Sequence, residues 1–252
     1  MMRLDAHRNA ILTLALAAGT TTLARAADAQ IPTLHPSFYG SGEADTRHSQ
    51  FYLLGMYVGL GGLGWSPYFN VNGWALHYRP DPSNTATSTL SAVSPTLGLA
   101  YASRNRGVSF GAGYNWVHNP NIAAPGAEGG GTNGATASLG AYNNGTRRRS
   151  LHTQLLANYN FDSRYIWARG RASIPFGYFR RQPSRLGLEV VGQDGGKNGI
   201  TTNEFQVGPT LEYVWTPNFR TTGVLGYKSV GGSAFTSRDN AAYFKLEFSL
   251  SP

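Results

Sequence analysis

Residues 108–116 read Val-Ser-Phe-Gly-Ala-Gly-Tyr-Asn-Trp, so every second residue is apolar and the residues between are small or polar. A period of two matches a β-strand, whose side chains point alternately to its two faces, and does not match a helix. One face of this strand is therefore apolar and the other is polar. Similar blocks recur along the chain from Ser49 to Leu250.

These blocks predict ten strands. They lie at residues 49–60, 67–78, 92–103, 108–118, 150–161, 164–174, 185–193, 203–215, 219–228 and 241–250. Most have the roughly 9–11 residues that a tilted strand needs to cross the hydrocarbon of a bilayer. We predict an all-β fold, an antiparallel transmembrane up-and-down β-barrel. A soluble sandwich is the alternative, but it would bury the apolar face against a second sheet.

The connections between strands leave the strand count open. Residues 119–149 are rich in Gly and Asn, and we interpret them as a long extracellular loop within a barrel that spans residues 49–252. Ten strands counted from a periplasmic N-terminus would instead put this loop in the periplasm. A further strand at Pro36–Gly42, in the lead-in at residues 30–48, would move the loop outside, and another within Ala135–Tyr142 would make twelve. We predict ten to twelve strands.

The first 29 residues predict a cleaved signal peptide. Arg3 and Arg8 form a basic region, residues 11–24 are mildly apolar, and Ala27-Asp28-Ala29 fits a cleavage site, as does Ala24-Arg25-Ala26. The apolar stretch is too short to span a bilayer as a helix. We therefore predict export and location in the bacterial outer membrane.

Composition supports a membrane barrel. The 14 Tyr, 12 Phe and 5 Trp all lie at or after Phe38, and only 13% of residues are charged, against about 25% in soluble domains. Two tight turns, Phe161–Tyr165 and Trp215–Phe219, are flanked by aromatic residues and fit the aromatic girdles of a barrel. The chain has no cysteine, which excludes disulfides and thiolate chemistry.

The basic balance of the chain, a formal charge of +8, indicates anionic partners. The export signal and the lack of a nucleic-acid-binding motif exclude nucleic acid. We expect contact with outer-membrane lipids, lipopolysaccharide phosphates or an acidic polysaccharide. Basic residues beside predicted strand ends are the candidate contacts to anionic lipid or glycan, although charge at strand ends also protects strands against aggregation. They are Arg147, Arg148, Arg149, Arg180, Arg181 and Arg185.

The alternation also places charged residues inside the barrel. They are Arg169, Arg171, Glu189, Glu204, Glu212, Lys228, Lys245 and Glu247. Charges in a narrow lumen are costly unless they are paired. Two interpretations follow: a salt-bridged polar core that fills the barrel, or a narrow channel whose arginines select small anionic solutes.

Catalysis finds little support in the sequence. After the predicted signal peptide, histidines occur at His35, His48, His77, His118 and His152; His118 and His152 flank the long loop and could meet, but no Gly-x-Ser-x-Gly motif accompanies them. Glu189, Glu204 and Glu212 could supply paired carboxylates for glycoside hydrolysis, but nearby arginines favour a structural role. No spacing of His, Asp and Glu fits a metal site. We predict no enzyme activity, no cofactor and no metal, and a lipid-modifying enzyme is only the third alternative.

The C-terminal part resembles a known family. Residues 185–193, Gln206-Val-Gly208, Gly226-Tyr227 and residues 243–249 resemble the small outer-membrane barrels of the cellulose biosynthesis accessory family, over residues 150–250. The resemblance implies a non-enzymatic accessory role in cellulose or other exopolysaccharide biosynthesis and secretion, with the secretion machinery as partner and no catalytic residues. Such barrels commonly end on an aromatic residue that the assembly machinery reads. This chain ends Leu250-Ser251-Pro252, so we expect Phe248 to serve instead.

Overall fold

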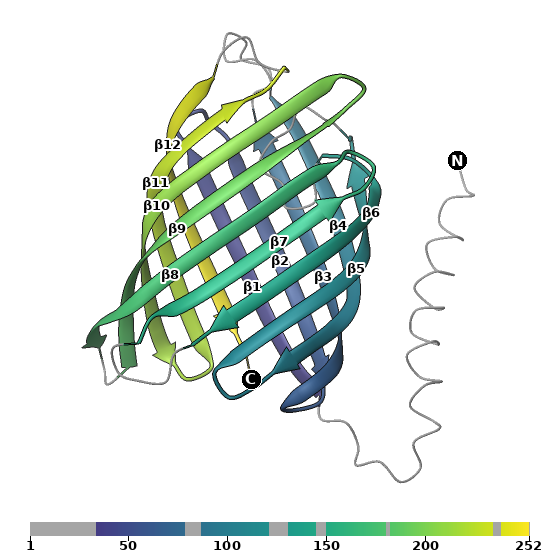
Figure 1. Cartoon of the computed structure of the whole chain (residues 1–252). Coiled ribbons are helices and arrows are strands. Elements are labelled where there is room, and N and C mark those ends of the chain that lie inside the picture. Colours follow the sequence, from purple (N-terminus) through teal and green to yellow (C-terminus); the bar gives the residue numbers. More distant parts are fainter. Residues whose placement is uncertain are drawn as a thin grey trace, which may run out of the picture. The chain divides into compact units, whose positions relative to one another are not determined.

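Twelve antiparallel strands form a closed barrel in the computed structural model, which describes residues 34–78, 87–120, 131–144, 150–179, 182–233 and 238–251 (Figure 1). Each strand pairs with the next, and β1 pairs with β12 to close the sheet. The strands are β1 (Leu34–Asp45), β2 (Gln50–Leu60), β3 (Gly64–Tyr78), β4 (Ser88–Ala102), β5 (Arg106–His118), β6 (Gly134–Asn143), β7 (His152–Asn160), β8 (Tyr165–Phe179), β9 (Gln182–Lys197), β10 (Ile200–Thr216), β11 (Phe219–Gly231) and β12 (Asp239–Leu250). Closure leaves no unpaired sheet edge, which a membrane-spanning sheet requires.

All ten predicted strands are confirmed, and both optional strands form as β1 and β6, so the count is twelve. The interpretation of residues 119–149 as one long loop is wrong, because β6 divides it. The β6 sequence is rich in Ala, Ser and Thr and has little apolar alternation, but its backbone pairs with β5 on one side and β7 on the other. The barrel also begins at Leu34 and not at residue 49.

The two ends of the barrel differ in their connections. We call the end where β1 begins and β12 finishes the terminal end, and the opposite end the distal end (Figure 1). The longest connection, residues 119–133, lies between distal strand ends, and short turns such as 61–63 and 217–218 lie at the terminal end. Outer-membrane barrels have short periplasmic turns and longer extracellular loops. We therefore assign the distal end to the outside and the terminal end to the periplasm.

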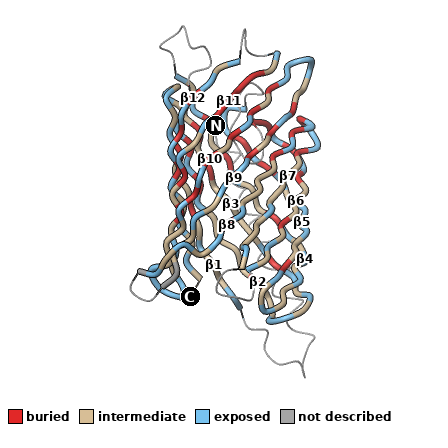
Figure 2. The backbone as a smooth tube through the Cα atoms, turned by 60° about the vertical axis from the view of Figure 1, so that its left-hand side comes forward, coloured by how far each residue is buried: buried red, intermediate tan, exposed pale blue. Residues whose placement is uncertain are grey.

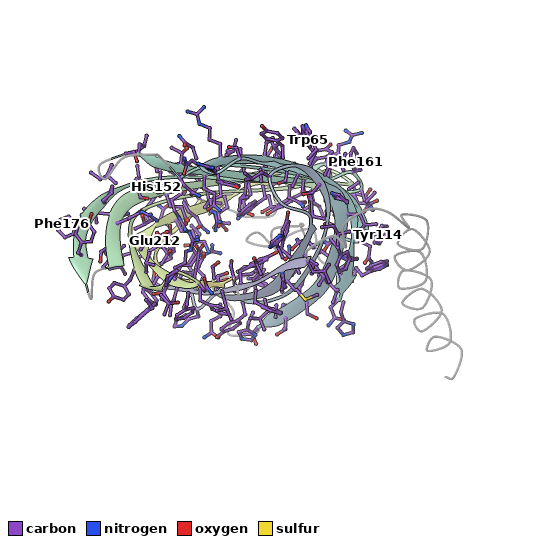
Figure 3. All side chains as sticks on the ribbon, turned by 90° about the horizontal axis from the view of Figure 1, so that it is seen from below. Trp65, Tyr114, His152, Phe161, Phe176 and Glu212 are labelled. Carbon is purple, nitrogen blue, oxygen red and sulfur yellow. The ribbon has the colours of Figure 1, made fainter. Side chains whose placement is uncertain are left out.

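The outer face is apolar and carries aromatic side chains near both ends, as a bilayer requires. Trp65 with Tyr101 and Tyr213 with Trp215 form ring pairs toward the terminal end, and Tyr114 with Trp116 and Tyr159 with Phe161 do so toward the distal end. Figure 3 shows Trp65, Tyr114, Phe161 and Phe176 pointing away from the barrel. One residue of the predicted girdle turns the other way: Tyr165 faces the lumen, is buried, and donates a hydrogen bond to Gln193 Oε1.

The lumen is packed most densely toward the distal end, where buried positions are concentrated (Figure 2). An apolar cluster on the inner faces of β2 to β5 makes up much of this packing. Its members, which we call the distal apolar cluster, are Phe51, Leu53, Trp74, Leu76, Tyr78, Leu90, Ala92 and Val117. Leu76 is only 2% exposed, so its side chain is closed off from solvent within this cluster.

The predicted signal peptide lies outside the described residues. No helix in the described part of the chain is long and apolar enough to cross a membrane.

Candidate functional site in the barrel lumen

The inner surface of the barrel is divided into two walls. Strands β2 to β6, all of whose residues are described, carry no formal charge at any inward position. We call this the neutral wall. Strands β8 to β12 together with β1 carry the inward charges, and we call them the charged wall. The lumen therefore presents two different chemistries to anything that enters it.

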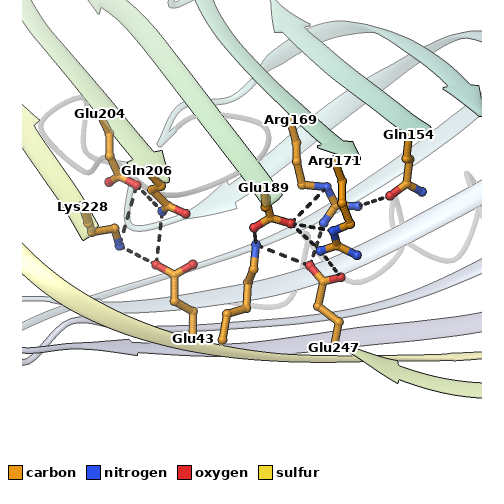
Figure 4. Close-up of polar contacts among 10 residues, drawn as sticks. Glu43, Gln154, Arg169, Arg171, Glu189, Glu204, Gln206, Lys228 and Glu247 are labelled. Atoms are coloured by element: carbon orange, nitrogen blue, oxygen red, sulfur yellow. Dashed lines mark hydrogen bonds and ion pairs between the residues drawn. The ribbon is translucent and has the colours of Figure 1, made fainter. Parts of the chain in front are cut away.

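A central ion cluster braces the charged wall (Figure 4). Arg169 Nη1 and Arg171 Nη2 on β8 each lie 2.7 Å from a carboxylate oxygen of Glu247 on β12. Because β9, β10 and β11 separate these strands in the sheet, the contacts run across the lumen. Glu189 on β9 pairs with Arg171 and with Lys245, and it is fully buried. Gln154 accepts a further hydrogen bond from Arg169 at 3.1 Å.

A second cluster lies closer to the distal end. Lys228 on β11 donates to Glu43 on β1 at 2.5 Å and lies 3.3 Å from Asp45 and 3.7 Å from Glu204. Gln206 joins Glu204 to Glu43 through its side-chain amide, at 2.5 and 3.2 Å (Figure 4). One cation therefore faces three carboxylates here, whereas the central cluster sets three cations against two.

A third group lines the terminal mouth of the lumen. Arg185 on β9 forms an ion pair with Glu212 on β10. His152 and Glu212 both point inward, as Figure 3 shows in a view along the barrel. Arg220 on β11 also faces inward and is exposed, and it makes no ion pair among the described residues. The balance of charge along the lumen thus changes from negative near the distal end to positive at the terminal mouth.

The buried ion pairs are structural contacts. Removing charged groups from water costs several kcal/mol per ion, and mutual pairing recovers this only when the hydrogen bonds are well made. Arg171 and Glu247 meet this condition, because Arg171 contacts two carboxylates and Glu247 contacts three cations. The contacts of Arg169 and Arg171 with Glu247 join two parts of the wall that the sheet does not join directly.

Four tyrosines that face the lumen each lie opposite a glycine on the neighbouring strand. Tyr39 faces Gly55, Tyr68 faces Gly98, Tyr142 faces Gly107 and Tyr243 faces Gly226, each as direct partners in the register. A Cβ atom on any of these glycines would overlap the opposing tyrosine ring. Each ring therefore occupies the space left by the missing side chain, an arrangement known to stabilise glycines in sheets.

The structure places all eight predicted interior charges on the inner face. It brings Arg169, Arg171, Glu189, Lys245 and Glu247 into the central cluster, and Lys228 and Glu204 into the second. Glu212 is separate from both and pairs with Arg185 at the terminal mouth.

The structure describes one of the six arginines that were predicted to contact anionic lipid or glycan. Arg185 faces the lumen and is held by Glu212, so it does not reach the lipid surface. Residues 147–149 and 180–181 lie outside the described residues. In the sequence they fall between β6 and β7 and between β8 and β9, pairs of strands whose facing ends lie at the terminal end. That end is opposite to the one we assign to the lipopolysaccharide leaflet.

Glu43, Asp45 and Arg220 also contribute charges to the lumen, but they were not among the interior charges predicted from the sequence. The optional first strand was predicted to end at Gly42, one residue before the first buried carboxylate. The alternation of Phe38, Gly40 and Ala44 on one face with polar residues on the other continues to Asp45 and could have extended it.

The geometry brings no catalytic group together among the described residues. His118 points outward at the distal end of β5 and His152 inward at the terminal end of β7, so the predicted possibility that they meet is wrong. Ser173 faces His152 in the register, but no hydrogen bond joins them. Across the described ranges, no three His, Cys, Asp or Glu side chains gather in a way that could hold a metal ion.

Comparison with known proteins identifies the fold. No family model matches the chain, and no curated protein matches it. Among solved structures, the KdgM porin is 12% identical, with 86% of this chain and 99% of that chain covered and a TM-score of 0.44. LpxR from Salmonella typhimurium is 11% identical, with 85% and 99% covered and a TM-score of 0.50. The COG4313 outer membrane channel from Pseudomonas putida F1 is 12% identical, with 89% and 97% covered and a TM-score of 0.48.

These similarities at such low identity define the fold and no more. The closed twelve-stranded sheet with an apolar outer face and a polar lumen is that of a bacterial outer-membrane β-barrel. Because the sheet is closed and its outer face is apolar, the protein is located in the bacterial outer membrane.

Proposed function

We propose that the barrel is a narrow porin-like channel for small polar solutes, with a preference for anions. The observation that carries the proposal is the terminal half of the neutral wall. Ser66, Ala100, Ser109 and Ser138 face the lumen there, are small, and remain partly exposed. These small side chains fill little of the lumen beside the tyrosine rings of the neutral wall, and the serine hydroxyl groups allow water to occupy the space next to them.

The distal apolar cluster is then the narrowest part of the path, because apolar constrictions gate channels by excluding water. Reconstitution of the purified barrel in planar bilayers tests this directly. We expect small single-channel currents from the wild type and larger ones from Trp74→Ala, which shortens a buried side chain of the cluster. Trp65→Ala on the lipid face is the control. Silent bilayers with both the wild type and Trp74→Ala would refute the channel.

The anion preference depends on the terminal mouth, where Arg185 and Arg220 face the single carboxylate of Glu212. In a salt gradient, the reversal potential should indicate that chloride permeates more readily than potassium. Arg220→Gln should shift that potential toward zero by removing a cation that has no ion-pair partner, whereas Arg106→Gln, outside the lumen, should leave it unchanged. Equal potentials in all three proteins would contradict the role of Arg220, and a wild-type potential that favours potassium would contradict the preference for anions.

An accessory role in cellulose or other exopolysaccharide secretion is the second candidate. The uncharged, hydroxyl-bearing neutral wall favours it, because such a surface suits a neutral glycan. Deleting the gene should then lower exopolysaccharide output, and unchanged output would remove this candidate.

We also propose that the barrel is not an enzyme, since His152 stands among charged neighbours with no hydrogen-bonded nucleophile among the described residues. Release of fatty acid from lipopolysaccharide by the purified protein would overturn that proposal.

A further inference from the structure

We propose that the terminal half of the neutral wall is a binding site for a neutral sugar ring, with Tyr57 and Tyr142 as its stacking surfaces. The inference goes beyond conduction, because such a site would bind sugar even in a barrel that passes no current. It rests on three features of the neutral wall: the way its tyrosines are held, the groups around them, and the direction from which they can be reached.

The tyrosines are held against the wall by glycines. The Tyr142 ring lies directly over Gly107, where a Cβ would overlap it, yet the residue is 39% exposed. The part of the ring turned away from Gly107 is therefore open to the lumen. Tyr68 lies over Gly98 and is buried, and Tyr57 stacks on it with ring centroids 5.1 Å apart and planes 25° apart. The hydroxyl groups of Tyr68 and Ser138 both lie over Gly111 on β5, so the tyrosine pair extends across the neutral wall to β6, the strand that carries Tyr142.

The surroundings of this group are polar but uncharged. Ser66, Ser109 and Ser138 supply hydroxyls on the same inner face, and Asn70 beside them supplies an amide that accepts a hydrogen bond from Tyr39 at 2.8 Å. A ligand pocket of this kind combines aromatic surface with a few hydrogen-bonding groups that set orientation. A sugar ring has the matching surface, with C–H groups on its faces and hydroxyls around its edge.

Other ligand classes fit less well. An anion would gain more at the terminal mouth, beside Arg185 and Arg220, than on a wall without formal charge. A purely apolar molecule would cover the serine hydroxyls and leave them without hydrogen-bond partners, which is costly. A neutral polyhydroxylated ring satisfies both the aromatic rings and the hydroxyls.

The site is open toward the terminal end. Tyr142 is the last residue but one of β6, which ends there, and Tyr57 lies in the terminal half of β2. The opposite end of the neutral wall is occupied by the distal apolar cluster. A sugar would therefore reach the tyrosines from the terminal end, which is the periplasmic side in the orientation assigned above.

The test measures sugar binding to the full-length barrel in detergent micelles by calorimetry and saturation-transfer NMR. The probes are cellohexaose and maltohexaose, both neutral, and a hexamer of glucuronic acid as the charged comparison. We expect at least one neutral hexamer to bind, and more tightly than the charged one. Tyr142→Ala should weaken that binding about fivefold or more, because stacking on one ring contributes an effect of this size.

Control variants separate stacking from a general effect on folding. Tyr142→Phe keeps the ring and should keep most of the affinity, while Tyr142→Leu keeps apolar bulk without a ring and should not. Tyr101→Ala removes an exposed tyrosine of the lipid face and should bind sugar like the wild type. No binding of either neutral hexamer, tighter binding of the charged one, or equal binding by Tyr142→Leu and the wild type would each overturn the proposal. A silent barrel that binds sugar would refute only the channel.

Discussion

Glu189 is a charged residue with no exposed surface, and the stability of the charged wall depends on it. Its carboxylate pairs with Arg171 and Lys245, and Arg169 lies 4.0 Å away. Glu189→Gln keeps the shape but leaves Glu247 as the one carboxylate of the cluster for three cations. Loss of one partner from a buried ion cluster costs about 3–5 kcal/mol. We therefore expect a clear fall in the urea midpoint of unfolding from detergent micelles.

An exposed ion pair on the same barrel provides the control. Asp162 lies 2.5 Å from Lys197 at the distal end, but their side chains are 37% and 36% exposed. Exposed pairs contribute about 1 kcal/mol or less, so Asp162→Asn should change the midpoint little. Similar losses in the two variants would mean that the lumen is wetter than the burial of Glu189 indicates.

For single residues, the sequence predicted which side chains point inward but not which of them contact one another. Alternation alone assigns Arg169 and Glu247 to the inner face, because residues at every second position of a strand point to the same face. Their contact depends on the curvature of a closed sheet that brings β8 and β12 face to face across the lumen. Arg185 was assigned to a lipid or glycan surface because it stands near other arginines in the sequence. It lies four residues before Glu189 on β9, however, so both side chains point to the same, inner face.

Strand β4 illustrates how glycine sets the spacing between elements. A Cβ on Gly98 would overlap both the Tyr68 ring and the carbonyl oxygen of Phe110 on β5. Gly98→Ala must therefore move a backbone as well as a side chain, and we expect it to cost about 1–3 kcal/mol, as overpacking usually does. Gly170→Ala on β8, where a Cβ meets no atom within 4 Å, should be neutral. Unfolding curves of the two variants measure the difference, and equal midpoints would show that the sheet adjusts freely.

Strand prediction succeeded where one face is strongly apolar and was weakest where it is not. Phe244, Leu246 and Phe248 mark β12 without ambiguity, because lipid contact demands large apolar residues at every second position. The outward positions of β6 include Ala135, Ala137 and Ala141, which are too small to stand out among Gly and Asn. Pairing with β5 and β7 makes β6 a strand, and pairing partners are not visible in a local pattern.

For the whole molecule, an even number of strands places both ends of the barrel's sheet on one side of the membrane. The two strands that sequence patterns left optional therefore decide where every connection lies. With β1 and β6 in place, the hairpin between β9 and β10 is distal and the turn between β10 and β11 is terminal. The unequal lengths of the connections assign the distal end to the outside.

Cysteine labelling tests this orientation with little background, because the chain has no cysteine of its own. Ile200→Cys at the exposed distal start of β10 should react with a membrane-impermeant maleimide on intact cells, whereas Asn218→Cys in the terminal turn should react only after the outer membrane is opened. The reverse pattern would place the terminal mouth, with Arg185 and Arg220, at the cell surface, and sugars would then reach Tyr142 from outside the cell. Reaction of both positions on intact cells would show that the reagent crosses the membrane, and a larger maleimide would then be needed to decide the orientation.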